Sequence, residues 1–101
     1  MIKHCSMAKY KPFAEGCSAQ ENMTKAKVMT LALKDQIPQL LRIEVGFNML
    51  NGPTDFDAVS YSEYEDMDAV MATVNHPAHD ALIGFLKLVT EASHAVTYDA
   101  P

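Results

Sequence analysis

Four histidines are the residues of this 101-residue sequence whose side chains could exchange protons near neutral pH. His4 falls in the middle of a strand-like segment, where an imidazole should be substantially buried and should need a hydrogen-bond partner. His79 belongs to a helical segment that should lie over this first strand. We therefore expect His4 and His79 to form the catalytic pair of a site, suited to an enolising or aldol-type step. The alternative interpretation is that His4 is a core histidine whose hydrogen bonds are satisfied.

The candidate substrate-binding residues surround this pair. Ser6 and Ala8 share a strand face with His4, and their short side chains should leave space for water or a ligand. Tyr98 could donate its hydroxyl to a substrate carbonyl or could lie in a dimer interface. His76 is a further candidate, although it should cap the helix that Pro77 begins.

No metal or cofactor is predicted. His76 and His79 are three residues apart and could share one helical face, but the only nearby carboxylate is Asp80, which should point elsewhere. His94 should be exposed. The seven methionines are best explained as core filler and flexible pocket lining.

Composition excludes several classes of partner. The net charge of −5 comes without a basic stripe, so a nucleic-acid partner is not expected. No apolar run approaches the roughly 18 residues of a membrane span, and the first residues alternate instead of forming a signal-peptide block, so we expect a cytoplasmic protein and no membrane partner. Cys5 and Cys17 have neither metal-finger spacing nor the density of a disulfide scaffold, which predicts two free thiols.

Periodicity supplies the elements that position these residues. Apolar and polar residues alternate over 2–10, 41–48 and 57–64, which predicts three strands, and residues 95–99 should close the chain as a fourth. Ser18 and Glu21 form a capping box that should start a helix, and Pro38 should end it. A second helix is expected from the acidic segment 65–68 to about Val74, and after the reset at His76 it should continue over 81–91. The residues expected to face the core from these helices are Met23, Ala26, Met29 or Thr30, Leu33, Ile37, Leu82, Phe85, Leu86 and Val89.

The order β-α-β-β-α-β predicts one α+β domain over residues 1–101, with a ferredoxin-like antiparallel four-stranded sheet and helices on one face. The other sheet face should carry Cys5, Met7, Val59 and Tyr61. An apolar patch of this kind usually marks a protein interface. We therefore expect two such sheets to pair into a dimeric α+β barrel.

Four segments resemble the stress-responsive dimeric A/B barrel (Dabb) family, in the family's order. They are Met1-Ile2-Lys3-His4, Ile37-Pro38-x-Leu40-Leu41-x-Ile43-Glu44-Val45-Gly46, Glu63-Tyr64-Glu65-Asp66 and His76-Pro77-Ala78-His79. The resemblance covers residues 1–99 and implies a homodimeric barrel with a pocket between helices and sheet. It also implies a range of activities that includes a plant polyketide cyclase. Active-site histidines of that cyclase match His4 and His79, whereas its catalytic tyrosine aligns with Thr73.

These observations predict a stress-responsive homodimer that binds a small molecule, with lyase or cyclase chemistry on carbonyl-rich apolar compounds as the leading activity. A different class of function is a non-enzymatic stress or scaffold protein whose stable dimer is its role. A monooxygenase of the dimeric barrel type is a third alternative. The sequence leaves open whether the protein is an enzyme and which ligand it binds.

Overall fold

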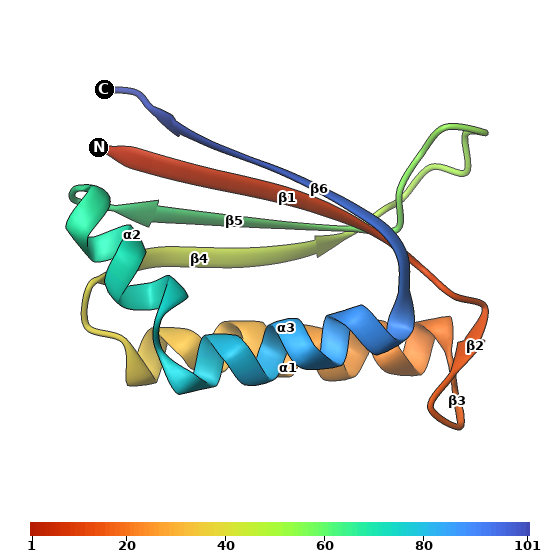
Figure 1. Cartoon of the computed structure of the whole chain (residues 1–101). Helices are drawn as coiled ribbons and strands as arrows, with labels where there is room; N and C mark the ends of the chain where they lie inside the picture. Colours follow the sequence, from red (N-terminus) through yellow and green to blue (C-terminus); the bar gives the residue numbers. More distant parts are fainter.

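Four long strands form one antiparallel sheet in the order β4-β5-β1-β6 (Figure 1). In this computed structural model, which describes all of residues 1–101, they are β1 (Ile2–Tyr10), β4 (Leu40–Phe47), β5 (Ala58–Tyr64) and β6 (Thr90–Asp99). The first strand lies in the centre and pairs with both β5 and β6. The predicted ferredoxin-like α+β fold is confirmed.

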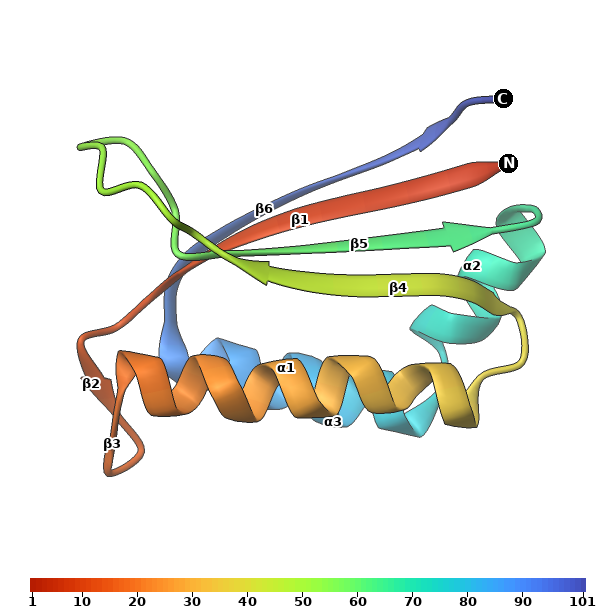
Figure 2. The same cartoon turned by 180° about the vertical axis from the view of Figure 1, so that it is seen from behind.

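The helices cover only one face of this sheet. Helices α1 (Ala19–Gln36) and α3 (Pro77–Val89) lie side by side beneath it, and the short α2 (Met67–Val74) lies near the end of β5 (Figures 1 and 2). Both views show the opposite face bare. No helix is both long and apolar enough to cross a membrane.

The predicted helix starts are confirmed by their caps. The Ser18 hydroxyl accepts a hydrogen bond from the Glu21 N–H (3.2 Å), and the Glu21 carboxylate accepts one from the Ser18 N–H (3.0 Å). At α3, Nδ1 of His76 accepts a hydrogen bond from the Ala78 N–H at 3.0 Å, with Pro77 as the first helical residue. His76 thus has the capping role that the sequence favours, and it fixes where α3 begins.

Two strand boundaries differ from the prediction. A register shift between Leu40 and Arg42 buries Leu40 completely and leaves Leu41 45% exposed, so Leu41 does not continue the inward face of β4. At the other end, α3 stops at Val89, and β6 begins at Thr90 instead of residue 95. Pairing with β1 extends β6 through a polar stretch that lacks alternation of its own.

A small hairpin was not predicted. Strands β2 (Phe13–Ala14) and β3 (Cys17–Ser18) are joined by Glu15 and Gly16, both with positive φ, at 50° and 75°. Positive φ at both central residues matches the backbone of a type I′ hairpin turn. Cys17 therefore lies in a strand, and both it and Cys5 are free thiols, as expected.

The core between helices and sheet is divided in two. One cluster contains Leu33, Ile37, Leu40, Tyr64, Ala69, Val70 and Leu82, and the other contains Tyr10, Met23, Ala26 and Val89. The inward side chains of the central strands between them are short, namely Ser6, Ala8, Ala58, Ser60 and Ser62. Because these short residues face two long helices, they leave space that neither cluster fills.

The bare face carries apolar side chains in cross-strand register. Met7 lies opposite Val59, and Cys5 lies between Tyr61 and Val96. Met7, Val59 and Val96 are 47%, 38% and 56% exposed. Towards one end this face becomes polar, where Tyr61 donates a hydrogen bond to Glu63 at 2.7 Å.

Candidate functional site

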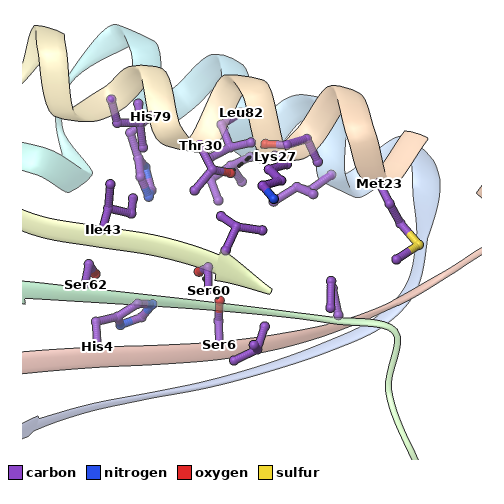
Figure 3. Close-up of a pocket in the computed structure, with 18 of the residues that line it drawn as sticks. His4, Ser6, Met23, Lys27, Thr30, Ile43, Ser60, Ser62, His79 and Leu82 are labelled. Carbon is purple, nitrogen blue, oxygen red and sulfur yellow. Dashed lines mark hydrogen bonds between the residues drawn. The ribbon is translucent and has the colours of Figure 1, made fainter. Parts of the chain in front are cut away.

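A cavity of about 130 Å³ lies between the helices and the inner face of the sheet (Figure 3). The short residues of β1 and β5 form its floor, and side chains of α1 and α3 form its opposite wall. Its lining includes members of both core clusters, such as Leu33 and Met23, so the cavity occupies the space between them. Its size is close to the roughly 150 Å³ of an apolar cavity that admits benzene.

His4 enters this cavity from the centre of the sheet. Its Nδ1 lies 2.7 Å from the Thr97 hydroxyl of β6, which is directly opposite in the register. A hydroxyl can donate or accept, so this contact is compatible with either neutral tautomer, and Nε2 forms no hydrogen bond with the protein. Burial lowers the pKa of His4, and the neighbouring His79 lowers it further.

His79 reaches the cavity from the first turn of α3, and Figure 3 shows its ring pointing from the helix towards the sheet that carries His4. Burial lowers the pKa of His79 as well, although the Asp80 carboxylate and the Val74 carbonyl act in the opposite direction. Burial therefore favours the neutral form of both imidazoles. A neutral imidazole can accept a proton at one nitrogen and donate a hydrogen bond from the other.

Four of the hydroxyl groups that line the cavity form two sets, which differ in their free hydrogen-bonding capacity. Thr30 and Thr73 donate to carbonyls of their own helices, at 2.7 and 3.1 Å, so their donor capacity is used. On the floor, the hydroxyls of Ser6 and Ser60 lie 2.9 Å apart and bond to each other. This serine pair keeps acceptor capacity for a ligand or water, and in the sheet register it lies between the levels of His4 and Ala8.

The structure brings together four of the six candidate residues. His4, Ser6, Ala8 and His79 all line the cavity. The other two lie elsewhere, because His76 caps α3 and Tyr98, which is 41% exposed, pairs with Lys3 at the outer side of β1. No three histidine, cysteine, aspartate or glutamate side chains lie close enough together to hold a metal ion.

Sequence reasoning missed several lining residues. Ser60 and Ser62 alternate with Tyr61 on a predicted strand, so the same alternation that places Ser6 and Ala8 on one face also indicates these two serines. Lys27 of α1 is half-buried and also lines the cavity, although its charge is typical of a solvent-facing position.

Solved structures with this fold span almost the whole chain. A dimeric, ferredoxin-like protein of unknown function from Bacteroides fragilis is 26% identical, with a TM-score of 0.83, and the match covers 98% of this chain and 95% of that one. A hydroxynitrile lyase from Passiflora edulis is 16% identical (TM-score 0.77, covering 96% and 90%). A cofactor-independent oxygenase from Streptomyces nogalater is 14% identical (TM-score 0.73, covering 98% and 91%).

These likenesses establish the fold, and three of the matched structures are described as dimeric. Among curated proteins there is no significant match. The model of the stress responsive A/B barrel domain, Dabb, matches residues 2–100, and the chain therefore belongs to the Dabb family.

Proposed function

We propose that this protein binds a small, largely apolar carbonyl compound in the cavity between its helices and sheet. The observation that carries the proposal is a cavity of about 130 Å³ between the helices and the sheet that both His4 and His79 line. Ligand sites are typically apolar cavities with a few convergent polar groups, and here those groups are the two imidazoles and the Ser6–Ser60 pair.

The chemistry that this arrangement supports is proton transfer next to a carbonyl group. One neutral imidazole would accept a proton from the carbon beside the carbonyl. The N–H of the other would donate a hydrogen bond to the oxygen, where negative charge develops as the enolate forms. Return of the proton to a different atom, or attack of the enolate on a second carbonyl, would complete a lyase or cyclase reaction. The lyase and oxygenase relatives share only the fold with this chain, so they favour neither reaction.

Binding can be tested separately from catalysis. A panel of small ketones and phenols should include compounds that raise the melting midpoint of the wild type, because a ligand selective for the folded state stabilises it. Ala8→Leu should abolish this effect by filling the cavity. Ala81→Leu is the matched control, since Ala81 is exposed on α3. If no compound stabilises the wild type, or if the shift survives in Ala8→Leu, the binding proposal fails.

Catalysis is tested by isotope exchange. In heavy water, the protein should speed deuterium incorporation beside the carbonyl of a bound ketone, as followed by NMR. His4→Gln and His79→Gln should each remove most of this acceleration while the midpoint shift with ligand persists. If exchange is no faster than in buffer, the protein binds its ligand but does not catalyse this proton transfer.

A homodimer through the bare sheet face is part of the same proposal. Met7, Val59 and Val96 give this face an apolar surface, and the dimeric relatives support self-association. Such an interface should bury on the order of 1,500 Å² in total. Light scattering should give a dimer mass for the wild type and for Val28→Asp, which alters an exposed residue of α1, and a monomer mass for Val59→Asp. A wild-type monomer would refute the dimer.

The same face favours a second function, a stress or scaffold protein whose dimer is its role. The family description as stress responsive is compatible with both functions. The two are separated by the ligand panel, because a scaffold requires the dimer but no occupant of the cavity.

A further inference from the structure

One residue lining the cavity carries a formal charge. Its other lining residues are apolar, hydroxyl-bearing or imidazole side chains, and Lys27 alone contributes a cation. Figure 3 shows Lys27 reaching from α1 into the space between the helices and the sheet. Lys27 is a half-buried residue, and an ammonium that gives up water inside a mostly apolar cavity is stabilised by an anionic partner.

The protein supplies no anionic partner for this ammonium. The ion pairs of the chain involve the N-terminus and Arg42, and none involves Lys27. No aspartate or glutamate lines the cavity, although the chain has 13 of them and a net charge of −5. The contact that Lys27 does make is with an aromatic face, since its Nζ lies 5.2 Å from the centre of the Phe47 ring.

Lys27 and the histidines lie at different ends of the cavity. Phe47 is level with Ala58 and Ala8 in the sheet register, whereas His4 is level with Ser62 and Ile43. Four residues of β1 separate these two levels, which corresponds to roughly 13 Å along a strand. Between them lie the Ser6–Ser60 pair and apolar side chains.

We infer that the ligand of this cavity is a carboxylic acid, with its carboxylate bound by Lys27 and its reacting carbonyl, several carbon atoms away, beside His4 and His79. This inference rests on the proposed function and names its substrate class as keto acids with an apolar chain or ring. An ammonium–carboxylate contact in a partly desolvated site is worth more than a neutral hydrogen bond, so an acid should be preferred over its amide.

The test compares phenylpropionate with phenylpropionamide, which share one shape and differ in charge. Binding is followed by NMR shifts of cavity residues in the wild type, in Lys27→Met, which keeps an apolar stem, and in Lys34→Met. Lys34 is the matched control, since it is an exposed lysine two turns along the same helix. The acid should bind about tenfold more tightly than the amide in the wild type and in Lys34→Met, and the ratio should fall to near one in Lys27→Met.

The outcomes separate this inference from the function on which it rests. If acid and amide bind the wild type equally, or if the preference survives in Lys27→Met, the cavity binds ligands but the assignment to Lys27 is overturned. If neither probe, nor any compound of the ketone and phenol panel, shifts cavity residues, the proposed function fails and the inference fails with it.

Discussion

Leu33→Ala should strongly destabilise the protein. Leu33 is 4% exposed and packs in the larger core cluster with Ile37 and Leu40, but one side of it borders the cavity. Replacing a buried leucine by alanine costs about 2.7–5.0 kcal/mol, depending on the void that remains. Because Leu33 already faces empty space on one side, it makes fewer contacts than a fully enclosed leucine. We therefore expect a loss of about 3 kcal/mol, near the lower end of that range.

For a domain of about this length, 1 kcal/mol corresponds to roughly 4–8 °C in the melting midpoint, so the loss of about 3 kcal/mol should lower the midpoint by roughly 12–24 °C. Urea unfolding at fixed protomer concentration gives the free energy directly, since a dimer makes apparent stability depend on concentration. Leu31→Ala is the control, because Leu31 is on the same helix but 38% exposed, and it should cost about 1 kcal/mol or less. Equal losses of unfolding free energy for the two variants would show that Leu33 does not lie on the core-facing side of α1.

Further outcomes follow from the caps, the core and the histidines. Ser18→Ala should lower the free energy of unfolding by about 1 kcal/mol in urea titrations, whereas Ser18→Asp should retain most of the stability that the cap contributes. An unchanged free energy for Ser18→Ala would show that the capping box does not stabilise the protein. Phe85→Ala should cost about 2 kcal/mol, because the ring is only half-buried, and a loss below about 0.5 kcal/mol would contradict its packing against the core. Stability should also fall as the pH drops from about 6.5 towards the lowered pKa values of His4 and His79, because the unfolded chain takes up protons there that the folded chain does not. Double replacement of these histidines by glutamine should flatten that part of the stability–pH curve, and an unchanged slope would show that they are not buried as neutral groups.

The elements could be predicted because local signals agree with the tertiary structure. Alternation and caps describe most of the strands and all helix starts. The register shift that buries Leu40 in place of Leu41 could not be predicted, since it depends on how β4 meets Tyr64 of the neighbouring strand. Thr90 likewise becomes part of a strand only because β1 offers it a pairing edge.

The residues of the candidate site could likewise be predicted only where local sequence signals place them. His4, Ser6 and Ala8 share a face by simple alternation, and His79 follows from the helix that covers them. Lys27 looks like a solvent-facing residue in sequence, because its burial depends on Phe47, which is 20 positions away in the chain and contacts it only after folding.

The central position of β1 affects how the protein folds. One edge of β1 pairs with β6, and the residues that meet there, such as His4 and Thr97, are 93 positions apart. During synthesis this edge stays open until almost the whole described chain has left the ribosome, and an unpaired strand edge is prone to pair with other chains. Contacts of such long range slow folding, because the intervening chain must be ordered first. Since Thr97 also supplies the partner of His4, the candidate site is completed only in this last step.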